Sequence, residues 1–402
     1  MNFTRRDFGK LAMASVPAAA GLSIPGMMQA AQSSKFDGVQ IGAITYSFRG
    51  GAAQGGVPPA DMPATMQKIG LSGVELMSGD CETIAGIPQN PNAGRGGGGF
   101  GGGRGGSGRG PGGGGGGGGF GRGGGAGASG AEIATAPNGC AVNTPSGRDS
   151  AAKAAAASGA PAPAGRGGGG GRGPATPTPE QEAFQKSVAD WKMAANASTW
   201  KGVKQKFNDA GVDVQILCYN MNINTTKDDE IEYAFQMARD LGVRAISCST
   251  TMAMAKRVAP FADKHKIMWA GHGHFNIYDP EEFAKPETFR ELIALGKYMG
   301  VNLDIGHFTQ AGYDPMTFIP EIHARITNLH LKDSMKPDKC GTAGATQPWG
   351  MGQTPIKDVL LLMKKNKYPF PANIELEYRI PQGSDSATEV GKCLEFAKKC
   401  FA

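Results

Sequence analysis

The sequence lacks several patterns that would place it in a familiar class. Its seven cysteines form no C-x-x-C pair, so nothing supports a zinc ribbon. No strand-like run is followed by G-x-G-x-x-G, the turn typical of dinucleotide-binding sheets. We also expect no transmembrane segment in the mature chain. The odd cysteine count permits a disulfide, with Cys393 and Cys400 seven positions apart, but buried free thiols are favoured at Cys218 and Cys248.

The N-terminus has the layout of an export signal. The segment TRRDFGK (4–10) precedes an alanine-rich apolar stretch that ends in small residues near position 31. This order is typical of a signal peptide, and the pair Arg5 and Arg6 favours the twin-arginine type. We therefore expect residues 1–31 to be removed and the mature protein to be periplasmic or secreted. An ordinary first helix is the alternative.

Residues 91–175 are dominated by glycine, with GRGGGGFGGGRGGSGRG as the densest part. Such a stretch has too little apolar surface to offset the entropy of ordering its backbone, so we predict a disordered insertion. Its arginines and interspersed phenylalanines would also suit an RNA-binding arginine-glycine tract. Because export separates the protein from RNA, a solvated spacer is favoured.

The net charge of +6 comes from these two segments. Residues 91–175 contribute +6, from seven arginines and Lys153 against Glu132 and Asp149, and residues 1–31 contribute +2. The remaining chain is therefore near −2. A charge of this sign argues against a nucleic-acid-binding face on the folded part.

Residues 32–90 and 176–402 alternate β-rich runs with amphipathic stretches, which suits a single large domain. Apolar strands that alternate with helices indicate a parallel sheet, and eight such units close a (β/α)8 TIM barrel, here with the insertion after strand two. Gly-Val in the triplets at 210, 241 and 299 fits a helix end followed by a strand start. An open doubly wound sheet is the alternative. The predicted strands are 39–46, 73–77, 212–219, 243–249, 266–272, 301–306, 325–331 and 372–378, and the helices include a long one at 180–210.

Polar residues lie at the ends of the predicted strands, where TIM barrels hold their active sites. Asp304 ends strand six, and His330 ends strand seven. Glu375 and Glu377 share one face of strand eight, and we assign Glu377, nearer the mouth, to a metal and Glu375 to a deeper position. Aspartate, histidine and glutamate together suit Mn, Mg, Co or Zn. Three independently satisfied polar residues are the alternative.

The motifs LDIGHF, RITNLHLKD and IELEY resemble those of the xylose isomerase-like TIM barrel superfamily, in particular its sugar phosphate isomerase/epimerase family, which includes tagatose 3-epimerase and inosose dehydratase. The resemblance runs from about Val39 to the C-terminus, apart from the insertion. It implies that Asp304 and His330 are metal ligands. It also implies that His307 contacts the substrate and that Glu377 is both ligand and catalytic base.

Strand five departs from the family pattern. Epimerases of the family carry a glutamate at its end, as second base and ligand, whereas this chain reads WAGHGHF. His272 takes the nearest matching place, so we predict it as the fourth ligand and a catalytic residue. His274 shares its face and is predicted to contact the substrate. A histidine here favours a lyase over proton exchange between two carboxylates.

Four further residues are predicted to complete the substrate pocket. Tyr46 follows strand one, Glu75 ends strand two, and Lys332 shares a face with His330. Trp349, in the segment PWGMGQTP, offers an aromatic face to a sugar ring. A structural role is the alternative for each.

We therefore predict an exported, metal-dependent sugar isomerase or epimerase that removes a proton beside a carbonyl and forms an enediolate. A lyase or dehydratase that uses the same metal site on a 3-keto sugar or glycoside is the first alternative, and a non-catalytic sugar-binding module is the second. The expected partner is a small carbohydrate. Nucleic acid is not expected, because the endonucleases of the superfamily need more metal ligands and a basic face. A homo-oligomer stays open.

Overall fold

The computed structural model of the chain describes residues 33–49, 56–90 and 178–402. All described residues belong to one compact unit. The predicted signal segment and the glycine-rich insertion both lie outside the described residues. Among the residues that are described, no helix is both long and apolar enough to cross a membrane.

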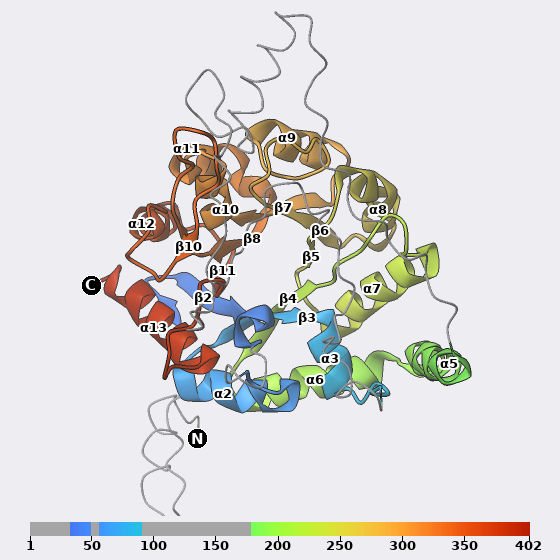
Figure 1. Cartoon of the computed structure of the whole chain (residues 1–402). Coiled ribbons are helices and arrows are strands. Elements are labelled where there is room, and N and C mark those ends of the chain that lie inside the picture. Colours follow the sequence, from blue (N-terminus) through green and yellow to red (C-terminus); the bar gives the residue numbers. More distant parts are fainter. Residues whose placement is uncertain (1–32, 50–55, 91–177) are drawn as a thin grey trace, which may run out of the picture. The chain divides into compact units, whose positions relative to one another are not determined.

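Eight parallel strands close a barrel (Figure 1), which confirms the predicted TIM barrel. Each strand pairs with the next along the chain, and the last pairs with the first from Ala372 opposite Ile41 to Ile374 opposite Ala43. The short β1 (Lys35–Phe36) adds to β2 in the antiparallel sense. The barrel strands are β2 (Val39–Ile44), β3 (Gly73–Met77), β4 (Asp213–Cys218), β5 (Ala245–Cys248), β6 (Met268–His272), β7 (Met299–Asp304), β8 (Ile326–Leu331) and β11 (Ala372–Ile374).

Helices lie around the outside of the barrel (Figure 1), because each presents an apolar stripe to the strands. On α7 (Asp228–Leu241), the buried residues Ile231, Phe235 and Ala238 are three or four positions apart and therefore share one face. Burial of each large side chain contributes about 1.5–3 kcal/mol. The other covering helices are α2 (Met62–Ile69), α6 (Ala197–Asp209), α8 (Met252–His265), α9 (Pro286–Ala294), α11 (Pro315–Ile322), α12 (Ile356–Asn366) and α13 (Ser386–Lys399).

The stretch predicted as one helix at 180–210 forms two helices. The first, α5 (Pro179–Ala194), begins with a capping box, in which the Thr178 hydroxyl accepts a hydrogen bond from the backbone N–H of Gln181. In return, the Gln181 side chain accepts one from the backbone N–H of Thr178 over 2.8 Å. Asn196 caps α6 in the same manner. A polar cap between the two amphipathic stretches thus divides them.

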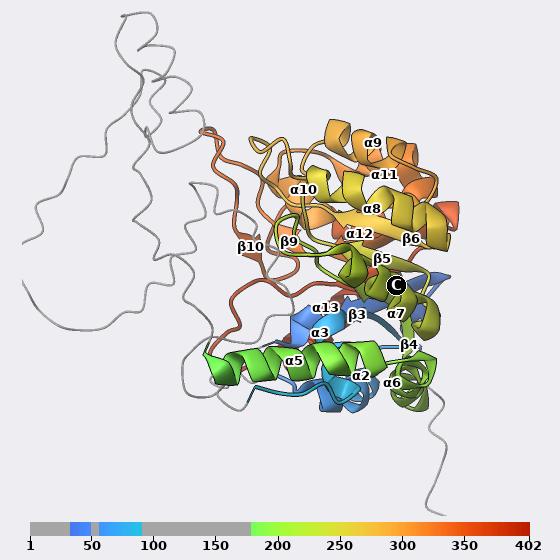
Figure 2. The same cartoon turned by 90° about the vertical axis from the view of Figure 1, so that its right-hand side faces the viewer.

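The predicted strand at 301–306 ends two residues early, at Asp304. The Asp304 carboxylate accepts a hydrogen bond of 2.8 Å from the backbone N–H of His307 and so begins α10 (Ile305–Gln310). Figure 2 shows α10 beside the hairpin of β9 and β10, at the end of the barrel to which the strands lead. The remaining short elements are η1 (Thr45–Phe48), η3 (Pro59–Asp61), α3 (Ser78–Ile84), η4 (His323–Arg325), β9 (Asp333–Ser334) and β10 (Thr346–Gln347).

Two of the three Gly-Val triplets end helices as predicted. Gly242 ends α7 with φ of 65°, and Gly211 follows α6 with φ of 74°, a left-handed conformation that glycine adopts without strain. The third triplet differs, because Gly300 lies inside β7. A Cβ atom there would come within 2.9 Å of the carbonyl oxygen of Arg325, so glycine permits a close approach of two backbones.

The cysteines of the barrel are mostly free thiols. Cys218 and Cys248 are free and buried, as predicted, and Cys393 and Cys400 are free rather than paired with each other. Cys81 is also a buried free thiol, whereas Cys340 is disulfide-bonded.

Candidate metal and substrate site

Four polar side chains from neighbouring strands converge inside the barrel. Asp304, the last residue of β7, lies opposite His330 in the register of β7 and β8. His272 ends β6, and Glu375 follows the last residue of β11. Each offers one nitrogen or oxygen atom, and these four atoms lie within 4.8 Å of one another. The structure thus brings together three of the residues predicted as metal ligands, namely His272, Asp304 and His330.

The glutamate in this group is Glu375, whereas the sequence analysis assigned Glu377 to the metal. The reason is that β11 ends at Ile374, so the alternation of strand faces no longer fixes how the next side chains point. Glu375 is buried, while 26% of the Glu377 side chain is exposed. Glu377 therefore lies beside the four donors, on the more accessible side.

A buried lysine joins the two glutamates. The Nζ atom of Lys332 is 2.9 Å from Oε2 of Glu375 and 2.5 Å from Oε2 of Glu377. It also lies 2.9 Å from Oδ2 of Asp304 and 3.0 Å from Nε2 of His307. Burial disfavours the charged lysine, but the carboxylates outweigh burial and hold its pKa well above the ordinary value. Lys332, predicted as a substrate contact, is thus an internal cation of the site.

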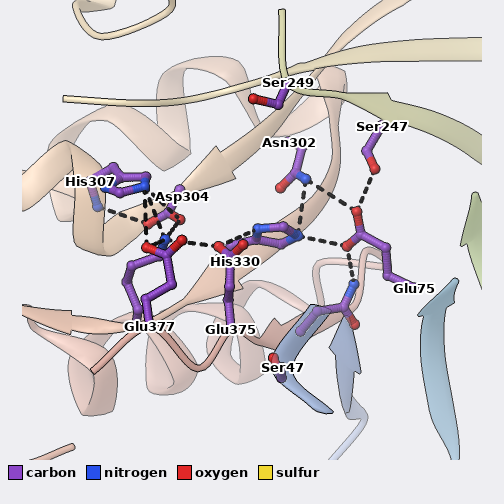
Figure 3. Close-up of polar contacts among 12 residues, drawn as sticks. Ser47, Glu75, Ser247, Ser249, Asn302, Asp304, His307, His330, Glu375 and Glu377 are labelled. Atoms are coloured by element: carbon purple, nitrogen blue, oxygen red, sulfur yellow. Dashed lines mark hydrogen bonds and ion pairs between the residues drawn. The ribbon is translucent and has the colours of Figure 1, made fainter. Parts of the chain in front are cut away.

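His330 is held between two carboxylates, as Figure 3 shows. Its Nδ1 atom lies 2.8 Å from Oε2 of Glu375, and its Nε2 atom lies 2.7 Å from Oε2 of Glu75. Burial favours the neutral ring, but the two carboxylates outweigh burial and raise the pKa of His330 well above its ordinary value. The ring is therefore an imidazolium that donates to both glutamates.

Glu75 lies beneath the four donors and is 0% exposed. The side-chain amides of Asn328 and Asn373 donate to its Oε2 atom over 2.7 and 2.9 Å, and the Ser247 hydroxyl donates to Oε1. With His330 these donors come from three different strands, β5, β8 and β11. Glu75 was predicted to contact the substrate, but the groups around its carboxylate belong to the protein, so it anchors His330 from below.

The asparagines of this network were not predicted, although the sequence carries a signal for them. Side chains two apart on a strand share a face. Asn302 precedes Asp304 by two positions, Asn328 precedes His330 by two, and Asn373 precedes Glu375 by two. The three strands thus carry polar ladders that face the interior of the barrel. Gln310, which contacts His307, was missed as well and has no comparable signal, because the predicted strand ended at position 306 and no helix was predicted directly after it.

The buried site carries more negative than positive charge. Its carboxylates are Glu75, Asp304, Glu375 and Glu377, and its cations are His330 and Lys332. With all four carboxylates ionised, the site is two positive charges short of neutrality. Burial raises the pKa of Asp304 to about 7, although Lys332 opposes this rise. Burial also raises the pKa of Glu375, but Lys332 and His330 outweigh it, so this pKa lies well below its ordinary value.

The two histidines at the end of β6, His272 and His274, are neutral. Burial, followed by the charge of His330, lowers the pKa of His272 well below its ordinary value. Burial, followed by His307, lowers the pKa of His274 to about 3. The Nε2 atom of His274 lies 3.0 Å from the hydroxyl of Ser249. The Nδ1 atom of His272 is buried and has no hydrogen-bond partner in the described part of the chain.

The tautomer of His307 is fixed by Gln310. Nδ1 of His307 donates to Oε1 of Gln310 over 2.6 Å, and the Gln310 amide donates in turn to the carbonyl oxygen of Gly344. Burial, followed by the charge of Lys332, lowers the pKa of His307 to about 4, so the ring is neutral. Its Nε2 atom is therefore an acceptor, which lies toward Lys332 and 3.6 Å from Oε2 of Glu377.

The two aromatic residues predicted in the pocket lie in different surroundings. Tyr46 is 39% exposed, and burial, followed by the charges of Glu377 and Glu375, raises the pKa of its phenol. Trp349 instead packs edge-on against Phe396 of α13, with ring centroids 5.8 Å apart. Trp349 thus contacts an outer helix rather than the acidic cluster.

The four converging residues fit a divalent metal ion. Two imidazoles and two carboxylates form a mixed nitrogen and oxygen set of the kind that zinc, manganese or cobalt accepts. The unpartnered Nδ1 atom of neutral His272 is suited to ligation. If His330 gives up the proton on Nδ1, Glu75 stays on Nε2 as the outer carboxylate that orients metal-binding histidines.

Comparisons with known proteins agree with this architecture. A family model described as xylose isomerase-like TIM barrel matches residues 126–400, more than half of the chain. No curated protein matches the chain.

Solved structures resemble the chain only distantly. The probable 3-DHS dehydratase AsbF from Bacillus anthracis is 10% identical, with a TM-score of 0.48, over 89% of this chain and 98% of that one. A sugar phosphate isomerase/epimerase from Parabacteroides distasonis is 16% identical, with a TM-score of 0.38, over 50% and 77%. The mannonate dehydratase of Streptococcus suis is 10% identical, with a TM-score of 0.41, over 52% and 82%. Likeness at this level carries no argument about activity.

The family of this chain is therefore assigned from the family model, and the eight-stranded barrel agrees with it. It extends from within the insertion to the end of α13 and includes the strands that supply His272, Asp304, His330 and Glu375. The chain belongs to the xylose isomerase-like TIM barrel family.

Proposed function

We propose that the protein is a metal-dependent enzyme that isomerises or epimerises a carbohydrate by moving a proton beside a carbonyl group. The observation that carries this proposal is the buried convergence of His272, Asp304, His330 and Glu375, with a further carboxylate, that of Glu377, next to it. A divalent ion held by these four residues would act as a Lewis acid that polarises the carbonyl and acidifies the adjacent C–H bond.

Glu377 is suited to take that proton. It is the most exposed carboxylate of the cluster, so a sugar that enters from the mouth of the barrel reaches it first. The Lys332 ammonium, 2.5 Å away, keeps the carboxylate in place. When the proton has moved to Glu377, negative charge develops on the sugar oxygen, and Lys332 supplies a positive charge and a hydrogen-bond donor beside it.

His307 and Tyr46 are suited to hold the sugar. Because Gln310 fixes the proton of His307 on Nδ1, the Nε2 atom is an acceptor, which now lies 3.0 Å from the Lys332 ammonium. A sugar hydroxyl can bind this Nε2 atom if the ammonium stays on Glu377. Tyr46 is partly exposed near Glu377 and offers both an aromatic face and a hydroxyl. His274, neutral and bonded to Ser249, lies at the same end through its contact with the ring of His307.

The test measures proton transfer directly. Metal-loaded protein is incubated with a panel of free ketoses in D2O, and uptake of deuterium beside the carbonyl is followed by NMR. We expect Glu377→Gln to abolish uptake and to keep the fold, because it preserves volume and removes the base. Glu395→Gln, which alters an exposed glutamate on α13, is the matched control. Deuterium uptake by Glu377→Gln at the wild-type rate would refute the role of Glu377.

A lyase or dehydratase is a second candidate, favoured by the neutral histidines at the end of β6. Epimerisation needs a base on each face of the carbon, whereas elimination needs one base and an acid for the leaving group. Glu377 is one carboxylate base, and the chain has His272 and His274 at the end of β6 in place of a second one. Incubation with 3-keto glycosides separates the two reactions, because an eliminating enzyme releases the aglycone. Saccharide binding without either reaction would favour a non-catalytic module.

A further inference from the structure

The ammonium group of Lys332 occupies a position shared between two sets of acceptors. Two of its four partners, Oδ2 of Asp304 and Oε2 of Glu375, belong to residues of the converging set, and each is 2.9 Å away. The other two, Oε2 of Glu377 at 2.5 Å and Nε2 of His307 at 3.0 Å, belong to residues outside it. Lys332 is 0% exposed, so all its partners are protein groups of this site.

Gly306 fixes the first part of this side chain. Gly306 lies against it so closely that a Cβ atom at position 306 would be 2.1 Å from Cγ of Lys332 and 2.7 Å from its carbonyl oxygen. The glycine therefore makes room for the first methylene groups and holds their path. Rotation about the remaining bonds of the side chain would move the ammonium from one pair of acceptors toward the other.

We propose that Lys332 is a resident counter-cation that competes with a divalent metal ion for Asp304 and Glu375. It gives up these two carboxylates by turning its ammonium toward Glu377 and His307. This inference rests on the metal site of the proposed function. A metal ion binds a carboxylate oxygen at about 2.0–2.2 Å, and those oxygens lie 2.9 Å from the present ammonium position. The two cations would thus be at most about 5 Å apart and would repel each other.

Two consequences of opposite sign follow. Without the ion, Lys332 keeps Asp304, Glu375 and Glu377 together against their mutual repulsion, so the carboxylates are already in position when an ion arrives. With the ion, the nearby ammonium lowers the affinity of the site. A residue that only supports the structure would stabilise the metal-free protein without weakening metal binding. If Lys332 competes with the metal ion, its removal should therefore both destabilise the metal-free protein and strengthen metal binding, whereas removal of a purely structural residue should only destabilise the protein.

The experiment measures metal affinity and stability in parallel. Full-length protein is stripped with a chelator, and zinc and manganese are titrated separately by calorimetry. We expect Lys332→Met to bind these ions about tenfold or more tightly than the wild type, because one competing charge is removed. The metal-free variant should unfold at lower urea concentration. Lys364→Met is the matched control, since Lys364 is an exposed lysine on α12 that pairs with Asp37 at 2.6 Å; its metal affinity should equal that of the wild type.

A second variant covers the case in which Lys332→Met does not fold. Lys332→Met combined with Glu377→Gln removes one charge of each sign, and it should bind metal more tightly than Glu377→Gln alone. Wild-type binding with unchanged or weaker affinity in the Lys332 variants would overturn the competition and leave the metal site standing. Absence of zinc and manganese binding in the wild type and in every variant would overturn both.

Discussion

Substitution of Glu75 by glutamine tests whether the buried network beneath the site holds the barrel together. The carboxylate has no exposed surface. Its Oε2 atom accepts hydrogen bonds from Asn328, Asn373 and His330. Its Oε1 atom accepts one from Ser247 and a longer one, of 3.4 Å, from the side-chain amide of Asn302. A glutamine has one oxygen, so its NH2 group must point at donors in either orientation. The less harmful orientation leaves the oxygen on the side of the three donors, because the Ser247 hydroxyl can rotate to accept.

The magnitude follows from that orientation. A hydrogen bond to a charged group contributes about 1.5–3 kcal/mol, whereas a neutral one contributes about 0.5–1.5 kcal/mol. Three bonds to Oε2 each lose about 1 kcal/mol when the carboxylate becomes an amide, so Glu75→Gln should lower the free energy of unfolding by about 3 kcal/mol. The loss of negative charge beside the His330 imidazolium acts in the same direction.

The assay is urea unfolding followed by circular dichroism. Glu182→Gln, which makes the same chemical change at an exposed position on α5, is the control and should stay within about 0.5 kcal/mol of the wild type. A loss of less than about 1 kcal/mol in Glu75→Gln would show that the carboxylate does not accept these bonds as an anion. Ser247→Ala should have a smaller effect, and combined with Glu75→Gln it should be less than additive, since the two side chains share one hydrogen bond.

Two further predictions concern other parts of the barrel. Gly306→Ala should destabilise the protein by about 1–3 kcal/mol in urea unfolding, because the new Cβ atom would lie 2.1 Å from Lys332 Cγ. Gly202→Ala on α6 is the control and should not destabilise the protein, because a Cβ atom there meets nothing within 4 Å. Equal effects of the two substitutions would refute the crowding at position 306. Burial raises the pKa of Glu282 to about 7 from 4.5, and its Oε2 atom has no hydrogen-bond partner in the described residues. An acid whose pKa is raised on folding loses stability as pH rises from about 4.5 to 7, so Glu282→Gln should be more stable than the wild type at pH 8 and not at pH 5. Since the side chain is only half-buried, we expect a gain of about 1 kcal/mol, and an equal gain at both pH values would contradict the pKa.

The strands of the barrel could be predicted because their signal is local. Each is a short apolar run bounded by polar residues or glycine, and the helices between them show apolar residues three or four apart, as on α7. The strand boundaries could be predicted less well. LDIGHF continues the apolar pattern, yet the Asp304 side chain caps α10 and ends β7 two residues before the pattern does. A single side-chain hydrogen bond thus decided the boundary.

The sequence predicted which residues lie in the site better than it predicted what each of them does there. Strand ends placed Asp304, His330 and His272 together, because parallel strands in a barrel lead to the same end. The choice between Glu375 and Glu377 depends on the path of the chain after β11 stops, which no periodicity describes. The place of Glu75 depends on donors more than 170 positions away in the sequence, such as Ser247 at a separation of 172. Such contacts exist only once the barrel has closed.

The capping box at the start of α5 has a consequence for how this chain tolerates its long insertion. The two hydrogen bonds of the box join Thr178 and Gln181, so four consecutive residues supply the cap of this helix. The first helix of the second part of the barrel can therefore start at the same residue whatever the length of the segment upstream. Insertions or deletions in that segment leave the residues that cap α5 unchanged. A repetitive glycine-coding tract in the gene can therefore change in length without changing the sequence that forms the barrel strands.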